Sequence, residues 1–188
     1  MKSLRYIAPA VVWTLCSISL AQSTTPPAAV TDSQTSFNTV KSLAGEWEGP
    51  VTLDPPMQGM PDMDKPVHIS LRVTSRGNAV VHEMQASGTP LDSTKYDHPV
   101  TMVYLDGDHL TLVHYCDAGN RPRMVARKSP HPETVEFDFV DLSGGDQEGH
   151  MHHAVLTSID ADHHTEDWTF MMPGNQPMHA HFTLHRVK

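Results

Sequence analysis

Cysteine is almost absent from this sequence of 188 residues, which contains only Cys16 and Cys116. Cys16 lies in an N-terminal segment that we expect to be removed, so Cys116 would be alone in the mature chain. No intramolecular disulfide can then form. A domain of roughly 150 residues buries enough apolar surface to fold without one. We therefore expect a single domain that is stabilised by a hydrophobic core.

Positively charged residues are scarce as well. Lys and Arg number 13 against 22 Asp and Glu, which gives a net charge of −9. No basic stripe interrupts this acidity, and an acidic surface repels the phosphates of nucleic acids. We therefore expect no nucleic-acid partner.

Long hydrophobic runs are missing too. The longest apolar stretch, residues 7–20, is shorter than the roughly 20 residues that span a bilayer, so we expect no membrane span. This stretch follows the positive Lys2 and Arg5 and ends at the small residues of Ser19-Leu20-Ala21, which is the pattern of a secretory signal peptide. We expect residues 1–21 to be cleaved off after Ala21 and the protein to be periplasmic or secreted.

Familiar catalytic motifs are lacking. The chain has no Gly-x-Ser-x-Gly motif, no Gly-rich phosphate loop and no Cys-x-x-Cys, and His82-Glu83 lacks the second His of a His-Glu-x-x-His zinc motif. His114 and Cys116 are a conceivable base and nucleophile, but side chains two residues apart on a strand run parallel and meet poorly. These absences favour a non-enzymatic protein over a small hydrolase or isomerase.

What the sequence does contain is a regular alternation of hydrophobic and polar residues. Residues 22–34, rich in Ser, Thr and Pro, are expected to form a flexible linker, and Phe37, Val40 and Leu43 have the spacing of a short helix. From position 46 onward, hydrophobic residues recur at every second position between turn signals such as Asp106-Gly107-Asp108. The expected strands are 46–53, 67–73, 79–87, 100–105, 109–116, 123–128, 134–142, 151–159, 165–172 and 178–187.

This order of short strands, without a helix long enough for a crossover, excludes a parallel sheet. We predict that residues 35–188 form an all-β domain. Its fold is an antiparallel up-and-down barrel of about ten strands with a short N-terminal helix, because closure removes the exposed edges of the sheet. A barrel of this width keeps an internal cavity, so we expect a small-molecule ligand.

The segment Leu43-Ala44-Gly45-Glu46-Trp47-Glu48-Gly49 resembles the Gly-x-Trp start of the first strand in calycin-type barrels, which include lipocalins, fatty-acid-binding proteins and haem-binding nitrobindins. The resemblance implies that Trp47 closes the floor beneath the cavity, where its indole packs against the helix. The chain is also similar to a group of exported bacterial calycin-like proteins without an assigned activity. The segments that carry this similarity are 106–110, 114–116, 118–124, 149–152, 160–163 and 168–169.

The same resemblance raises haem as a candidate cofactor. Nitrobindin-like proteins place an axial His near the C-terminus, shortly before a basic and apolar strand end. His179, ahead of Thr183-Leu184-His185-Arg186-Val187, has a comparable place. Pro50 departs from the nitrobindin pattern, which continues there with a small or polar residue and another Gly.

Copper or zinc is the other candidate cofactor, because several pairs of potential ligands are two residues apart on one strand face. These pairs are His114 with Cys116, His150 with His152, and His179 with His181. For the first pair, a buried thiol beside a hydrogen-bonded His is the favoured alternative. The last pair would simply be exposed if Ala180, Phe182 and Leu184 form the inner face, which we favour.

Three methionines, Met57, Met60 and Met63, repeat at every third position in a loop rich in Pro and Gly. They resemble the Met motifs that hold Cu(I) in exported copper proteins, because soft sulfur suits a soft ion. A hydrophobic flap over the barrel mouth is the favoured alternative.

We favour an exported, non-enzymatic binding protein that encloses a small, largely apolar ligand. The expected ligand-binding residues are Trp47, His114, Cys116, Arg123, Phe137, Phe139, Trp168 and Phe170. Arg123 is included because a guanidinium binds carboxylates well, although an ordinary salt bridge is its favoured alternative. A haem, copper or zinc protein is the second hypothesis. Its candidate ligands are His150, His152, His179, Met57, Met60 and Met63.

Overall fold

The structure, a computed structural model, describes residues 32–56 and 65–188. Its elements are α1 (Asp32–Ser42), β1 (Gly45–Gly49), β2 (Val51–Asp54), β3 (Val67–Thr74), β4 (Ala79–Ala86), β5 (Val100–Asp106), β6 (His109–Tyr115), β7 (Arg121–Arg127), β8 (Thr134–Ser143), β9 (His150–Ser158), β10 (His163–Met172) and β11 (Gln176–Arg186). A short 3-10 turn, η1 (Ser75–Gly77), lies between β3 and β4. Within the described ranges, no helix has both the length and the apolar character needed to cross a bilayer.

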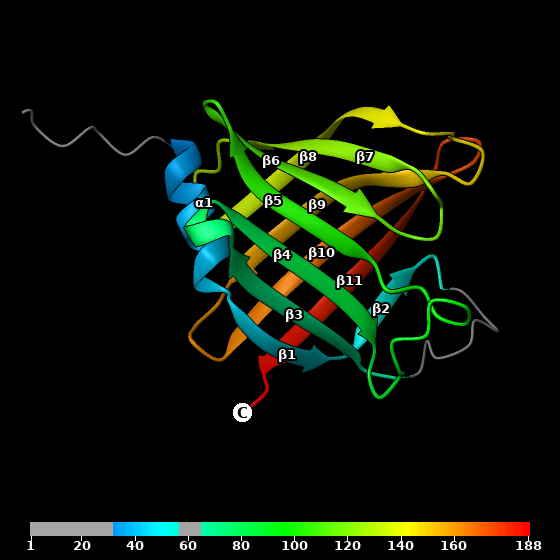
Figure 1. Cartoon of the computed structure of the whole chain (residues 1–188), viewed down its shortest axis with the longest axis horizontal. Coiled ribbons are helices and arrows are strands. Elements are labelled where there is room, and N and C mark those ends of the chain that lie inside the picture. Colours follow the sequence, from blue (N-terminus) through cyan, green and yellow to red (C-terminus); the bar gives the residue numbers. More distant parts are fainter. Residues whose placement is uncertain (1–31, 57–64) are drawn as a thin grey trace, which may run out of the picture.

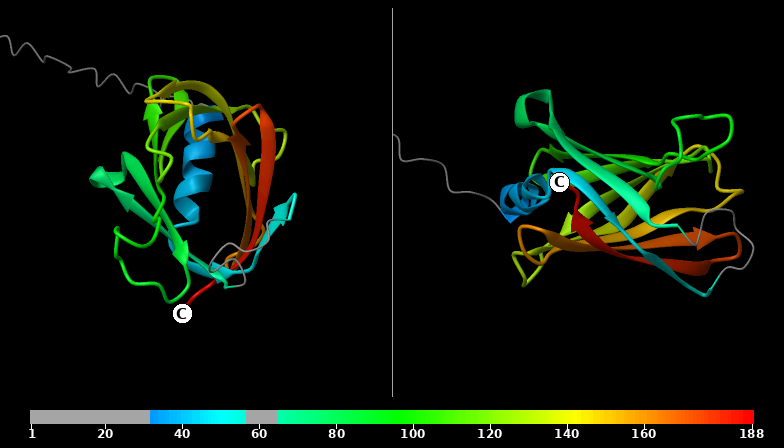
Figure 2. Two further views of the ribbon diagram at one scale, coloured as in Figure 1. Left: turned by 90° about the vertical axis from the view of Figure 1, so that its right-hand side faces the viewer. Right: turned by 90° about the horizontal axis from the view of Figure 1, so that it is seen from below.

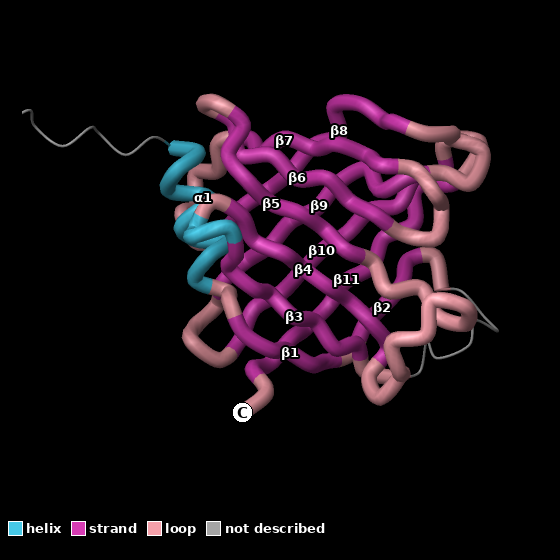
Figure 3. The backbone as a smooth tube through the Cα atoms, viewed as in Figure 1, coloured by secondary structure: helices cyan, strands magenta, loops and turns pink. Residues whose placement is uncertain are grey.

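The strands close into an antiparallel barrel (Figure 1). Each strand from β3 to β11 pairs with the next, and β1 completes the ring by pairing with both β3 and β11. Strand β2 continues β1 along β11, so β1 and β2 share one place in a wall of ten strands. The near and far strands cross at an angle in Figure 3, as the tilt of strands in a closed barrel requires. The predicted barrel is confirmed.

Pro50 divides the first strand, which the sequence predicts to run unbroken over 46–53. Proline has no backbone N–H to donate to a ladder, and its carbonyl accepts the Thr183 N–H at 3.2 Å. A Cβ atom on Gly49 would lie 1.9 Å from the Thr183 carbonyl oxygen, so only glycine fits at this position. The prediction of one continuous strand is therefore wrong, because the chain bends at Pro50 while it stays against β11.

Helix α1 covers one end of the barrel (Figures 1 and 2). Phe37 and Val40 are buried on its inner side, and Leu43 follows them into the core. Asp32 lies in the first turn, where a negative side chain is favoured by the partial positive charge of the helix N-terminus. The helix thus begins within the segment 22–34 that the sequence predicts to be linker.

The barrel wall encloses a core in which inward and outward residues alternate. On β11, Phe182 and Leu184 are buried and the intervening Thr183 is exposed. Val73 departs from the predicted pattern, because it is 38% exposed although it has the spacing of the buried Leu71. The reason is that β3 continues past the core toward η1.

The Asp106-Gly107-Asp108 signal forms the hairpin that the sequence predicts. Asp106 pairs with His109 where β5 and β6 meet, and Gly107 has a φ of 58°. Glycine adopts such a positive φ without strain, which is why the Asp-Gly pair suits a turn of this length. The hairpin places His114 at the far end of β6, on the inner face of the wall.

Candidate functional site

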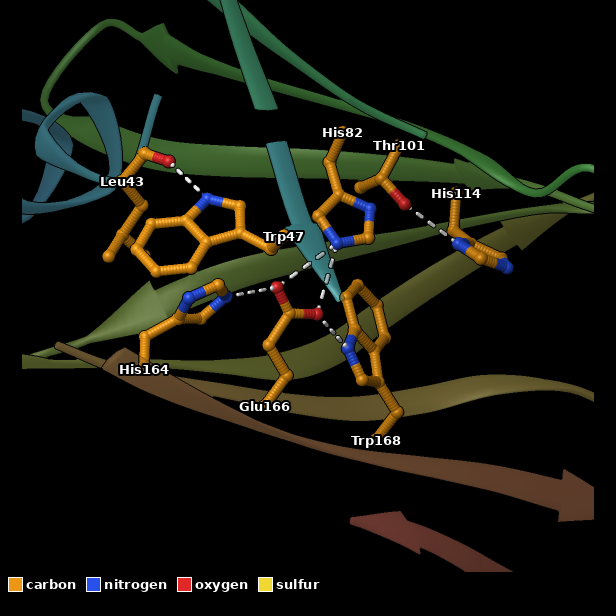
Figure 4. A network of polar contacts seen from close by, with 8 residues as sticks. All are labelled: Leu43, Trp47, His82, Thr101, His114, His164, Glu166 and Trp168. Carbon is orange, nitrogen blue, oxygen red and sulfur yellow. Dashed lines mark hydrogen bonds and ion pairs between the residues drawn. The ribbon is translucent and has the colours of Figure 1, made fainter. Parts of the chain in front are cut away.

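A buried carboxylate lies inside the barrel (Figure 4). Glu166 on β10 has no solvent exposure, and its two oxygens accept N–H groups from three side chains. His82 Nε2 lies 3.0 Å from Oε2 and 3.2 Å from Oε1. His164 Nε2 lies 3.1 Å from Oε1, and Trp168 Nε1 donates to Oε2 at 2.8 Å. A buried charge with this many donors is compensated for its loss of water.

Side chains along β10 point alternately inward and outward, which explains how these groups meet. His164, Glu166 and Trp168 are two residues apart and share the inner face, while His82 reaches them from the inner face of β4. Burial by itself raises the pKa of Glu166. The attraction of His82 and the hydrogen bonds from His164 and His82 outweigh burial and hold this pKa well below its usual range. Glu166 is therefore an ionised carboxylate in the core.

Trp47 connects the carboxylate network to the helix end of the barrel. Its indole Nε1 donates to the Leu43 carbonyl, just after α1, at 2.8 Å. Its ring meets the His164 ring edge to face, with 4.2 Å between the ring centroids. Arg186 lies over the Trp47 ring, 4.0 Å from its centroid. The helix end of the barrel is therefore filled by packed side chains.

A cavity of about 300 Å³ lies at the other end of the barrel. Two of its lining residues, Met172 and Met178, flank the β10–β11 turn, which is opposite α1 in Figure 1. Its apolar wall includes Met84, Met151, Trp168, Phe170, Met178 and Phe182. Its polar lining residues are Asp97, His114, Cys116, Asp117 and Glu148. The cavity is thus apolar in its walls and acidic in part of its lining.

His114 presents a free ring nitrogen to this cavity. Its Nδ1 lies 2.8 Å from Thr101 Oγ1, and Thr101 has no other side-chain partner among the described residues. This contact occupies Nδ1 and leaves Nε2 available to a ligand, as a donor or an acceptor according to the tautomer of the ring. Within the described chain Nε2 makes no hydrogen bond, and the ring lines the cavity (Figure 4).

Burial, with a smaller contribution from His82, lowers the pKa of His114 to about 4. The ring is therefore neutral at neutral pH. It offers a ligand one uncharged ring nitrogen, Nε2, beside the apolar wall of the cavity.

Two carboxyl groups meet at the rim of the cavity. Asp97 and Asp117 both line the cavity, and they lie just beyond the paired ends of β5 and β6. Burial, and then repulsion from Asp117, raise the pKa of Asp97 to about 6. Asp97, Cys116 and Asp117 also line a more open hollow of about 480 Å³, which places them between the cavity and the outer surface.

Cys116 lies at the same rim and is half-buried. Burial raises the pKa of its thiol, so the reactive thiolate is disfavoured. No hydrogen bond joins Cys116 to His114 in the described structure, because His114 Nδ1 is bound to Thr101 and Nε2 is free. This geometry does not assemble a nucleophile and its base.

The predicted ligand-binding residues divide into two groups. His114, Cys116, Trp168 and Phe170 line the cavity. The others do not: Trp47 and Phe137 are fully buried in the core, Phe139 stacks on His152, and Arg123 forms an ion pair with Asp141, with 3.1 Å between Nε and Oδ2. Arg123 is thus held in the ordinary salt bridge that we favoured for it.

The predicted metal ligands lie away from the cavity or outside the described residues. His150 Nε2 and His152 Nδ1 are 3.2 Å apart, and His150 Nδ1 is 2.7 Å from Asp146 Oδ1. His179 is exposed on the outer face of β11 and hydrogen-bonds to Thr169 at 3.0 Å. Met57, Met60 and Met63 lie outside the described residues.

One further cluster of potential metal ligands lies on the outer wall. The ligand atoms of Glu136, Asp138 and His153 lie within 4.8 Å of one another. Arg127 forms ion pairs with both carboxylates, so a positive group already occupies this exposed position. We assign no metal site there.

Haem does not fit the cavity. Its propionates are anionic, whereas Asp97, Asp117 and Glu148 line the cavity and none of its described lining residues is Lys or Arg. The predicted axial residue, His179, faces outward. We derive no chemistry from haem.

Sequence reasoning missed four residues of this region: His82, Asp97, Asp117 and Glu166. A signal was available for Glu166, because a charged residue at an inward position of an alternating strand indicates a buried polar partner. His82 carries the same signal on β4. Asp97 and Asp117 lie between strands, where alternation predicts no orientation.

Comparisons with known proteins bear on the fold. Neither a protein-family model nor a curated protein matches the sequence. The crystal structure of Rv2717c from M. tuberculosis is similar, with a TM-score of 0.53 and 13% identity over 81% of this chain and 98% of that one. A DUF3598-family protein of unknown function from Nostoc punctiforme has a TM-score of 0.46 and 10% identity over 79% of this chain. This chain spans about half of it, 49%. The similarity to Rv2717c supports a calycin-like barrel fold.

Proposed function

We propose that this protein is a non-enzymatic binding protein that holds a small, largely apolar molecule inside its barrel. The observation that carries the proposal is the cavity of about 300 Å³ with an apolar wall at the end opposite α1. Ligand sites in proteins are typically concave, mostly apolar, about 300–1,000 Å³ in volume, and furnished with a few polar groups. The cavity has these properties.

The packing beneath the cavity supports the same conclusion. Trp168 forms part of the cavity wall, and behind it the interior is occupied by the Glu166 network and Trp47. A bound molecule therefore meets a preformed, rigid surface there. Preorganisation of this kind favours affinity, because less side-chain freedom is lost on binding.

His114 supplies the orienting contact. Its free Nε2 is a neutral polar atom that the described chain leaves without a partner, so it favours a ligand with one hydrogen-bonding group at its buried end. The pKa of Cys116 is raised and it is not paired with His114, which supports binding rather than covalent catalysis.

We also propose that the protein acts outside the cytoplasm. The positive Lys2 and Arg5, the apolar stretch and Ser19-Leu20-Ala21 support export with cleavage after Ala21. A native mass spectrum of protein exported by its own N-terminus tests this directly. The expected mass begins at Gln22 and includes any retained ligand or metal, whereas an intact N-terminus contradicts the proposal.

The binding proposal is tested with N-phenylnaphthylamine, a neutral dye whose fluorescence rises in apolar surroundings. Ala180 lines the cavity, so Ala180→Trp should fill it and weaken dye binding by about tenfold or more, a loss of about 1.4 kcal/mol. The matched control is His185→Trp, which adds the same ring to the exposed face of the same strand and should bind like the parent protein. Equal dye binding by all three proteins, or none by the parent, overturns the proposal.

A further inference from the structure

We infer that the molecule bound in this cavity is an organic cation, with an apolar body inside the barrel and an ammonium group beside Asp97 and Asp117 at the rim. This inference rests on the proposed function and adds the chemical class of the ligand. It is carried by the charges at the rim, by the contact between two carboxyl groups and by the neutral His114 deeper inside.

The charged side chains around the cavity are all acidic. Asp97, Asp117 and Glu148 line it, and no Lys or Arg belongs to its lining in the described chain. A carboxylate ligand would therefore meet repulsion and no guanidinium. Arg123, the predicted carboxylate clamp, is instead paired with Asp141 on the outer side of the wall. The rim selects for positive charge.

The contact between Asp97 and Asp117 creates a place for that charge. Both side chains line the cavity, and both residues lie just beyond the paired ends of β5 and β6. Burial and the neighbouring Asp117 raise the pKa of Asp97 to about 6, so this carboxyl group is largely ionised at neutral pH. Two adjacent carboxylates then remain, and a ligand ammonium group with several N–H donors satisfies both.

The inner part of the cavity is compatible with this class of ligand. His114 is 3% exposed, and the unpartnered Nε2 belongs to a ring that lines the cavity. It is neutral, so it does not repel a cation. The aromatic rings of Trp168 and Phe170 suit an apolar body, and their faces also attract positive charge.

A metal ion is a poorer match for the same acids. In the described chain, three ligand atoms from His, Cys, Asp or Glu converge within 4.8 Å only at Glu136, Asp138 and His153, on the outer wall. Asp97, Asp117 and Glu148 therefore do not form a compact coordination site. A cation with an attached apolar body uses both the acids and the apolar wall.

The test is displacement of N-phenylnaphthylamine by three molecules with the same alkyl chain: decylammonium, decanol and decanoate, each below its micelle concentration. We expect decylammonium to displace the dye at a concentration about tenfold lower than decanol, and decanoate to be the weakest. In Asp97→Asn/Asp117→Asn, the advantage of decylammonium over decanol should fall to about twofold or less, with decanol unchanged.

The matched control is Asp106→Asn/Asp108→Asn, which removes the same net charge at the β5–β6 hairpin, near α1. It should keep the preference of the parent protein. If the rim double variant fails to fold, as judged by circular dichroism, Asp117→Asn alone gives the test. In this single variant, the advantage of decylammonium over decanol should fall at least threefold.

The outcomes separate the two levels of the proposal. Dye binding with equal displacement by all three molecules, or strongest displacement by decanoate, overturns the cationic ligand but leaves the binding function intact. Equal loss of the cation preference in the rim variant and the hairpin control shows attraction to net charge only and also overturns the inference. Absence of dye binding overturns the binding function and the inference together.

Discussion

Trp168 donates its indole N–H to Oε2 of Glu166 at 2.8 Å, while the same side chain lines the cavity. One residue therefore belongs both to the buried network and to the surface that meets a ligand. A hydrogen bond to an ionised carboxylate is strong and directional, so it fixes the orientation of the ring. The shape of the cavity thus depends on Glu166, which does not line it.

Replacing Glu166 should destabilise the whole domain. Glu166→Ala leaves His82, His164 and Trp168 with unpaired donors in the core, and breaking such a buried charged network costs about 3–5 kcal/mol. Urea unfolding measures the change. The exposed Glu83→Ala should stay within about 0.5 kcal/mol of the parent protein. A loss below about 1 kcal/mol for Glu166→Ala would show that the network contributes little.

We expect the free energy of unfolding to decrease at acidic pH because of His114. Its folded pKa of about 4 lies below its ordinary value of 6.5, so the unfolded chain binds more protons between these values. Stability is then lost as the pH falls from about 6.5 to 4, by at most about 3 kcal/mol. Unfolding of His114→Gln at several pH values should show a shallower loss. The exposed His185→Gln should keep the parent slope, and identical slopes for all three would contradict the prediction.

Asp97 should have the opposite effect on the pH dependence of stability. Its folded pKa of about 6 lies above its ordinary value of 3.8, so the folded chain binds more protons in this window and loses stability as the pH rises through it. Asp97→Asn has no carboxyl group to ionise. Its free energy of unfolding should therefore rise relative to that of the parent protein as the pH rises from 4 to 6.

Asp160 provides a control of opposite sign for Asp97. Its carboxylate accepts the Asp162 backbone N–H and pairs with His163, which lowers its pKa. Asp160→Asn should therefore become less stable relative to the parent protein as the pH rises toward the ordinary Asp value of 3.8, and the difference should stay constant above it. Parallel curves for Asp97→Asn and the parent protein would show that Asp97 is an ordinary surface carboxylate.

Closure of the barrel should depend on Gly49. A methyl group there would lie 1.9 Å from the Thr183 carbonyl oxygen, so Gly49→Ala forces β1 away from β11. Overpacking of this kind costs about 1–3 kcal/mol. Thermal unfolding measures it, with the exposed Thr52→Ala on β2 as the comparison. An unchanged melting temperature would mean that the wall relaxes freely at this point.

The fold was predictable from sequence because each strand shows its inner face through alternation. Phe182 and Leu184 between polar neighbours, and the Asp-Gly pair at Gly107, specify strand and turn locally. The break at Pro50 was visible as a proline within a predicted strand, but alternation on both sides of it favoured a continuous element. The alternation of hydrophobic residues thus predicts the barrel, but it does not predict the break of the first strand at Pro50.

The candidate site was predictable only where its residues lie on strands. His114, Trp168 and Phe170 follow the inner face of their strands, and all three line the cavity. Asp97 and Asp117 lie just beyond the open end of the β5–β6 hairpin, where Val100 pairs with Tyr115, so the hairpin register brings them together. Alternation within a strand does not reveal such a pair, because both residues lie outside the strands.

Because α1 and Trp47 fill one end of the barrel, we expect a bound molecule to enter and leave at the other end. An incoming molecule cannot push an occupant out from behind, so exchange must pass through an empty intermediate. The rate at which one occupant replaces another should then equal the spontaneous departure rate, however much competitor is added.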